Sequence, residues 1–296
     1  MLLNKLRKIT LAAVSIVTIA ILAAGCGSSD KKEEKAAASS NGKTIVKIAH
    51  EPDYMPYCYI GADKKSDGFE VAMMREINKL LPQYEFQFIA TSNDDLLIGV
   101  NTGKYDAGIK GAWYTSARKD KYIFPKHYIA ASTIGITFRS EDKDKIKDME
   151  SFARAGGKLV PIAPQNAQYA VVDSYNKKHP DNQVKLLPSE NFIVADAYTW
   201  VLEGRYDGYL SIELAYVNNV VKETGQYHKF ADKLAYIRHE AIPTYPLFNK
   251  KRTQLAADYD AAMEKLQKTG IIKELELKYL GEDVFQYVKS DGKEER

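Results

Sequence analysis

Apolar residues recur along this chain in two patterns, one typical of buried strands and the other of amphipathic helices. Runs rich in β-branched and aromatic residues predict strands at 44–49, 84–90, 105–110, 129–138, 158–163, 183–187, 208–212 and 234–239. Between them, apolar residues at helical spacing predict helices at 69–81, 94–101, 147–155, 168–178, 192–203 and 252–280, the last broken at Gly270. This alternation predicts an α/β fold with mostly parallel sheets flanked by helices.

The order of these elements also predicts two lobes. One series of strands and helices is followed by a second series, after which the chain returns to the first. Such an insertion joins the lobes by two crossing strands, which we expect near 135–138 and 240–246. The expected division is 44–136 with 245–288 for lobe 1, 137–244 for lobe 2 and 289–296 for a polar tail. A cleft between two lobes is the default ligand site.

The N-terminal part of the chain lies outside this pattern. A basic start and the apolar run 9–24 precede Cys26, and together they predict an export signal over residues 1–25. An uncleaved membrane anchor is the alternative, because an apolar run of this length nearly spans a bilayer. Residues 26–43 are small and polar without apolar periodicity, which is typical of a flexible tether.

Composition indicates a chain with a substantial core and no nucleic-acid surface. It has 296 residues, 45% of them hydrophobic, which is enough to build two lobes. The formal charge of +3 equals the contribution of Lys5, Arg7 and Lys8 in the export signal, so the remaining chain is near neutral. Five scattered histidines show no ligand spacing, and Cys58 lacks a catalytic neighbourhood. We therefore expect no metal, no cofactor and no nucleic-acid partner.

The stretch from Tyr105 to Arg118 carries the strongest candidate for a binding site. It reads as a strand, a small-residue exit at Gly111, and a helix capped by Thr115 with Arg118 in its first turn. Free backbone N–H groups at a helix start, together with a guanidinium, suit a carboxylate. A surface arginine in an ordinary strand–loop–helix connection is the alternative interpretation.

Four short segments, taken in order, resemble motifs of one protein family. They are residues 51–57 (EPDYMPY), 68–71 (GFEV), 111–118 (GAWYTSAR) and 201–208 (VLEGRYDG). On these motifs the chain from about residue 43 to 288 resembles the extracytoplasmic solute-binding proteins of polar amino-acid ABC transporters, which include the histidine-, lysine/arginine/ornithine- and glutamine-binding proteins. Residues 22–26 (LAAGC) resemble the lipobox of bacterial lipoproteins, although its leucine stands one position early.

The resemblance implies a two-lobed periplasmic-binding-protein fold and a monomer that binds rather than catalyses. Its function would be high-affinity capture of a small carboxylate-bearing solute, such as an amino acid or derivative, and delivery to an ABC importer. The lipobox resemblance implies that Cys26 becomes an acylated N-terminus, which holds the protein on the extracytoplasmic side of the bacterial cell membrane. A cyclohexadienyl or arogenate dehydratase-like enzyme and a ligand-sensing ectodomain are the alternatives.

The resemblance also assigns roles to individual residues. Arg118 would clamp the ligand's α-carboxylate, while Tyr54 and Tyr57 would stack on the ligand. Glu51 would face the ligand's side chain and favour a cationic or amide group there. The loop that opens a helix in lobe 2 would add backbone N–H groups to the same carboxylate, from Gln165, Asn166, Ala167 and Gln168. Core packing for the two tyrosines and a solvated loop end for Glu51 are the alternatives.

Three positions depart from the family pattern. Ile212 stands where the family usually has an acid for the ligand's α-amino group, and Glu213 would point to the opposite face of the strand. Trp113 replaces a Ser or Thr that touches the carboxylate, and Lys110 replaces a small residue beside Gly111. Because the carboxylate half of the site is retained and the amine half is not, we expect a carboxylate-bearing ligand enclosed by an aromatic wall.

Overall fold

The computed structural model describes most of the chain beyond the predicted tether. The described residues are 42–164, 166–188, 194–289 and 293. The predicted export signal, the predicted lipidation site Cys26, the candidate Gln165 and most of the predicted tether and tail lie outside these ranges. Among the described helices, none has the length and apolar character needed to cross a membrane.

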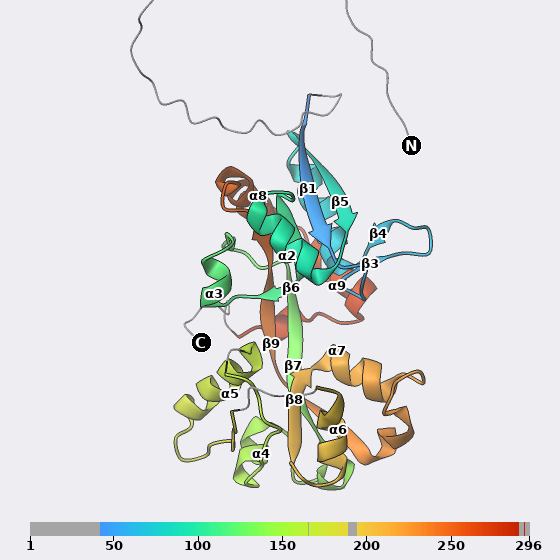
Figure 1. The fold of residues 1–296 in the computed structure, drawn as a ribbon, viewed down its shortest axis with the longest axis vertical. Helices are drawn as coiled ribbons and strands as arrows, with labels where there is room; N and C mark the ends of the chain where they lie inside the picture. Colours follow the sequence, from blue (N-terminus) through green and yellow to red (C-terminus); the bar gives the residue numbers. More distant parts are fainter. Residues whose placement is uncertain (1–41, 165, 189–193, 290–292, 294–296) are drawn as a thin grey trace, which may run out of the picture. The chain divides into compact units, whose positions relative to one another are not determined.

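A six-stranded sheet forms the centre of the fold, in the order β5–β1–β6–β9–β7–β8 (Figure 1). Its strands are β1 (Thr44–His50), β5 (Tyr84–Ala90), β6 (Ala107–Trp113), β7 (Ala130–Arg139), β8 (Gly208–Ile212) and β9 (Leu234–Phe248). β1 pairs in parallel with β5 and β6, whereas β9 runs antiparallel to both β6 and β7. β7 also pairs antiparallel with β8. A second, small sheet contains β2 (Asp53–Tyr54), β3 (Cys58–Ile60) and β4 (Ser66–Asp67).

Helices alternate with these strands, as the apolar pattern predicts. They are α1 (Phe69–Leu80), α2 (Asn93–Thr102), α3 (Ser116–Lys119), α4 (Met149–Arg154), α5 (Ala167–Lys178), α6 (Val194–Leu202), α7 (Glu213–Tyr216), α8 (Thr253–Leu266) and α9 (Ile271–Leu280). A π-helical turn at Val217–Val221 extends α7, and 3₁₀ turns lie at Ser140–Asp142, His228–Lys233 and Phe285–Tyr287. The break predicted at Gly270 is present, because this glycine has φ +79° between α8 and α9.

The buried apolar residues fall into separate clusters on either side of the middle of β7 and β9. One cluster joins β1 and α1 with α8 and reaches Ala130 in β7 and Phe248 in β9. Another joins α4 and α5 with the rest of β7, from Ile134 onward, and with Ile242 in β9. The long strands β7 and β9, which run side by side in Figure 1, are therefore the segments that pass from one core to the other.

Two predicted strands take a weaker form than expected. The segments at 158–163 and 183–187 contribute isolated parallel bridges, Lys158 to Lys185, Leu159 to Gly208 and Ile162 to Pro188. Conversely, the strand expected at 234–239 extends through the proline-containing segment to Phe248. Pro246 is tolerated inside β9 because the pairing with β6 is irregular beside it, whereas Pro243 precedes the residues of β9 that pair with β6.

An ion-pair hub involving Arg238 ties three segments together near the middle of β9. Its guanidinium forms two hydrogen bonds with Glu282, at 2.6 and 3.1 Å, and a third with Glu213 at 2.9 Å. The same guanidinium lies 4.5 Å from the ring centroid of Tyr287. Because Glu213 begins α7 and Glu282 follows α9, this hub links the chain after β8 to the C-terminal segment.

Candidate ligand-binding site

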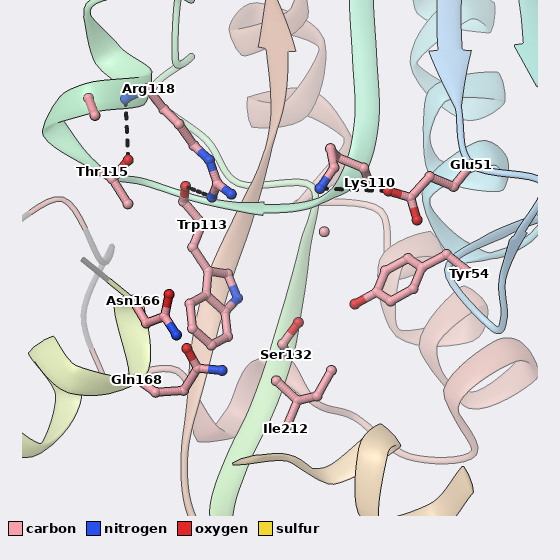
Figure 2. Close-up of a pocket in the computed structure, with 12 residues that line it drawn as sticks. Glu51, Tyr54, Lys110, Trp113, Thr115, Arg118, Ser132, Asn166, Gln168 and Ile212 are labelled. Atoms are coloured by element: carbon pink, nitrogen blue, oxygen red, sulfur yellow. Dashed lines mark hydrogen bonds and ion pairs between the residues drawn. The ribbon is translucent and has the colours of Figure 1, made fainter. Parts of the chain in front are cut away.

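The structure contains a cavity of about 490 Å³ that gathers most of the predicted site residues (Figure 2). The lining residues from the N-terminal half of the chain are Glu51, Tyr54, Lys110, Gly111, Trp113, Thr115, Ala117, Arg118 and Ser132. From the later segments, Asn166, Gln168 and Ile212 complete the lining. The cavity is therefore bordered by residues attached to both of the separate cores.

A break in the β6–β9 ladder determines the backbone conformation of β6 where it borders the cavity. Gly108 pairs with Leu247 and Ala112 with Tyr245, so three residues of β6 lie opposite Pro246 alone. Proline has no N–H to continue the ladder, and the bulge here leaves Lys110 and Gly111 without paired residues in β9. Both residues line the cavity.

Gly111 is required by this bulge. Its φ is +63°, and a Cβ at this position would lie 2.9 Å from ring atoms of Tyr54. Its N–H donates to the carboxylate of Glu70, a completely buried residue of α1, at 3.1 Å. The hydroxyl of Thr244 in β9 donates to the same carboxylate at 3.4 Å. Glu70 therefore holds the bulge in place from behind the cavity.

Burial raises the pKa of Glu70 to about 7, and this shift gives a testable pH dependence. Between pH 4.5 and 7 the folded protein keeps a proton that the unfolded chain has lost. The stabilising contribution is therefore full below pH 4.5 and is lost as the pH rises through 7. We expect the free energy of unfolding of the wild type to fall relative to that of Glu70→Gln by about 1 to 3 kcal/mol between pH 5 and pH 8. Urea denaturation across this range measures the difference.

The exposed Glu274→Gln variant is the control, because it changes the same charge outside the core. It should give a profile parallel to that of the wild type. Comparison between variants is needed because burial also lowers the pKa of His50, which acts in the opposite direction in part of this range. Parallel profiles for wild type and Glu70→Gln would mean that Glu70 is ionised in the folded protein throughout.

Arg118 lies in the first turn of α3 with its guanidinium at the cavity. The Thr115 hydroxyl accepts the Arg118 backbone N–H at 3.2 Å, so the predicted cap is present. The guanidinium donates to the carbonyl of Trp113 at 2.8 Å. No carboxylate within the described ranges forms an ion pair with it, and burial lowers its pKa. A half-buried cation that retains several unused N–H donors is well suited to an anion from solution.

Glu51 and Lys110 form an ion pair on another side of the cavity. Their closest atoms, Oε1 and Nζ, are 3.7 Å apart, and their side chains are 21% and 14% exposed respectively. Figure 2 shows this pair on the Tyr54 side of the cavity and the Arg118 guanidinium beside Trp113. The site therefore holds two cations and one carboxylate among its lining residues.

The two candidate tyrosines occupy different positions. Their rings stack with centroids 5.2 Å apart, but only Tyr54 lines the cavity. Tyr57 is buried behind it, and its hydroxyl donates to the carbonyl of Ala131 at 3.0 Å. Burial raises the pKa of both phenols, so both stay protonated. Tyr57 thus supports the aromatic wall and does not form its surface.

The later segments contribute a smaller and more polar part of the lining. Asn166 precedes α5 without capping it through its side chain, and both Asn166 and Gln168 line the cavity. Ala167 is the first residue of α5, but its side chain lies outside the described part of the structure, as does all of Gln165. Ile212 also lines the cavity. An apolar side chain therefore occupies the position where the family pattern has an acid for the ligand's α-amino group.

Glu213 does not compensate for Ile212. Its carboxylate accepts from Arg238 at 2.9 Å and also lies 2.7 Å from a second nitrogen of the same guanidinium. This ion pair holds Glu213 in the Arg238 hub. Glu51 is consequently the only carboxylate among the described residues that line the cavity.

The residue pattern alone did not identify Ser132 and Ala117 as lining residues. Ser132 belongs to β7, where Thr133 and Thr137 are polar as well, so its residue type alone gave little signal. Ala117 lies next to Arg118 and offers no chemical signal. Thr115 was assigned only as a helix cap, although it also faces the cavity. In the described part of the chain, no cluster of histidine, cysteine and acidic residues has a geometry suited to a metal ion.

Comparison with known proteins agrees with this architecture. The model of the bacterial extracellular solute-binding proteins, family 3, matches residues 46–282. The L-cystine-binding protein TcyJ of Bacillus subtilis (strain 168) is 26% identical over 89% of this chain and 92% of its own length. A second relative, the L-cystine-binding protein TcyK of the same strain, is 24% identical over 91% of this chain and 93% of its own.

A solved structure extends the comparison to the fold. It is that of a probable amino-acid ABC transporter extracellular-binding protein, ytmK from Bacillus subtilis, with a TM-score of 0.61 and 21% identity. The match covers 81% of this chain and 98% of that one, and it confirms the two-lobed periplasmic-binding-protein fold. The family match extends over most of the chain, from β1 to the end of α9, and it includes both sets of cavity-lining residues. The chain therefore belongs to the bacterial extracellular solute-binding proteins, family 3.

Proposed function

We propose that this protein captures a small carboxylate-bearing solute, an amino acid or derivative, in the cavity and delivers it to an ABC importer. One observation carries the proposal. The half-buried guanidinium of Arg118 lines the cavity, and its only hydrogen bond from the side chain goes to a backbone carbonyl within the described part of the chain. A buried cation without a counter-charge is costly, and a ligand carboxylate removes that cost.

The rest of the lining supports a small organic ligand. Tyr54 and Trp113 provide aromatic surface, while Ser132, Asn166 and Gln168 provide hydroxyl and amide groups. The relatives TcyJ and TcyK are named as L-cystine-binding proteins, which makes amino acids the first solutes to test. Ile212 and the engaged Glu213 favour ligands whose amino group is substituted or is met elsewhere in the site.

Ligand capture would proceed by closure of two lobes. We place lobe 1 at residues 44–136 and 245–288 and lobe 2 at 137–244. The separate cores support this division, since β7 and β9 pass from one cluster to the other. A ligand that contacts both sets of lining residues would stabilise the closed form, which the importer would recognise.

We further propose that the protein is a monomeric lipoprotein on the extracytoplasmic face of the cell membrane. Residues 1–25 would be the signal peptide, Cys26 the lipidated N-terminus and 26–43 the tether. Two or more acyl chains suffice for stable attachment, and a polar tether of this length lets the folded part reach a membrane partner. Residues 289–296 would form a polar tail.

A binding role also fits the ionisable groups of the site better than a dehydratase role. Lys110 and Glu51, the available base and acid, are paired with each other. The relatives TcyJ and TcyK are likewise named as binding proteins. We therefore propose transport in preference to turnover or signalling.

A thermal-shift screen of the purified full chain tests this function. The panel contains the common amino acids, L-cystine, N-acylated amino acids and small aromatic acids. A ligand present at a hundred times its Kd should add about 2.7 kcal/mol of stability and raise Tm by several degrees. The proposal fails if no carboxylate in the panel raises Tm, or if the Arg118→Ala variant shows an equal rise.

A further inference from the structure

The Lys110–Glu51 pair is a separate recognition element within the same cavity. β1 and β6 are parallel neighbours with His50 opposite Ile109, so Glu51 and Lys110 follow at equivalent positions just past the paired residues. The backbone of Glu51 is fixed there, because the buried His50 ring bonds its carbonyl oxygen at 2.8 Å. Lys110 directly precedes Gly111, whose N–H is held by the buried Glu70 carboxylate. The backbones that carry the two charges are thus held at the end of the paired region of the sheet.

The pair is incompletely satisfied within the protein. A separation of 3.7 Å is attractive but too long for a direct hydrogen bond. Across the described ranges, neither the Lys110 ammonium nor the Glu51 carboxylate forms a hydrogen bond, although both side chains are largely buried. Glu70, a buried acid that interacts electrostatically with both charges, is bonded to Gly111 and Thr244. The pair therefore presents N–H donors and carboxylate lone pairs together at the cavity surface.

We propose that this pair determines specificity by binding a ligand group that is neutral overall and carries a hydrogen-bond acceptor beside a donor. A second zwitterionic amino-acid head group and a carboxamide share this chemistry. In each, an oxygen would accept from Lys110 while an N–H donates to Glu51. The inference rests on the proposed function, with Arg118 binding the carboxylate at the other end of the ligand.

The same arrangement disfavours side chains with a single charge. A ligand ammonium would interact with Glu51 but be repelled by Lys110, and a ligand carboxylate would meet the reverse situation. Lys110 therefore cancels the preference for cations that Glu51 alone would give. Removing Lys110 should therefore restore a preference for cationic ligand groups, and removing Glu51 should give a preference for anionic ones.

Isothermal titration calorimetry with four probes tests the inference. L-glutamine and L-cystine carry the two matching groups, while L-glutamate and L-lysine carry a single charge at the corresponding end. The wild type should bind L-glutamine or L-cystine at least about tenfold more tightly than L-glutamate and L-lysine. The better of the two matching probes identifies which group the site takes.

Two single substitutions should change the ranking in opposite directions. Lys110→Met leaves Glu51 unpaired, so the affinity for L-lysine should rise relative to that for L-glutamine by about tenfold or more. Glu51→Gln leaves Lys110 unpaired and should favour L-glutamate to a similar extent. The exposed Lys119→Met and Glu274→Gln variants change the same net charges and should preserve the wild-type ranking.

The results also separate this inference from the proposed function. If both substitutions lower Tm but alter all four affinities by one common factor, the pair is only structural and the inference is overturned. It is overturned as well if none of the four probes binds while another carboxylate binds in an Arg118-dependent manner, and the proposed function then stands. Ligand binding that is independent of Arg118 would instead contradict the proposed function.

Discussion

Arg118→Ala is expected to weaken binding of the cognate carboxylate by about a hundredfold or more, without unfolding the protein. The variant removes the cation whose unused N–H donors face the cavity. Among the described residues, the Arg118 side chain donates only to the carbonyl of Trp113. Calorimetric titration with the solute that gives the largest thermal shift measures the loss. Because α3 is only four residues long, its own N-terminus should retain little affinity for the anion.

Two further variants make this result interpretable. Arg118→Lys keeps the positive charge but loses the planar pair of donors, so most of the affinity should still be lost. Arg154→Ala removes an exposed arginine that pairs with Glu150 and should leave binding unchanged. An Arg118→Ala protein that binds with wild-type affinity would show that the carboxylate is held elsewhere.

Gly135→Ala is expected to destabilise the fold by about 3 kcal/mol or more. A Cβ at this position would lie 2.0 Å from the carbonyl oxygen of Ile237 and 2.8 Å from ring atoms of Tyr236. The register of β7 against β9 shifts between Ile134 and Gly135, so the two backbones approach closely at the start of the core that contains Ile134 and Ile136. Urea denaturation monitored by circular dichroism gives the change.

Gly270→Ala serves as the matched control. It has φ +79° and no atom within 4 Å of the added methyl, so it should cost only about 1 kcal/mol through backbone strain. If Gly135→Ala costs no more than this control, the strands separate readily at this point. The close packing of β7 on β9 would then be unimportant for stability.

Local patterns are sufficient to predict strands that bury side chains in the core and helices that bury one side of their surface. β1, α1 and β7 follow the runs of apolar residues closely, because burial alone specifies them. β9 was less predictable. A strand with Pro243 and Pro246 violates local propensity, and the irregular pairing with β6 that accommodates Pro246 is a tertiary feature.

The same distinction applies to the candidate site. Arg118 could be placed at a ligand site from the strand end and the helix cap beside it, and Glu51 through the family resemblance. The roles of both as ligand contacts stay a prediction. The sequence does not distinguish Tyr57 from Tyr54. Tyr57 is buried behind Tyr54 because of the way in which β2, β3 and β4 form a small sheet, and this is a tertiary feature. The pairing of Lys110 with Glu51 depends on strand register, which the sequence pattern does not specify.

A crystal structure of the protein with the solute that stabilises it most provides the most direct test of this account. We predict that both carboxylate oxygens of the solute lie about 3 Å from the guanidinium nitrogens of Arg118, inside the cavity that Tyr54 and Trp113 line. A solute bound outside this cavity, or an Arg118 guanidinium bonded to a carboxylate of the protein itself, would contradict it.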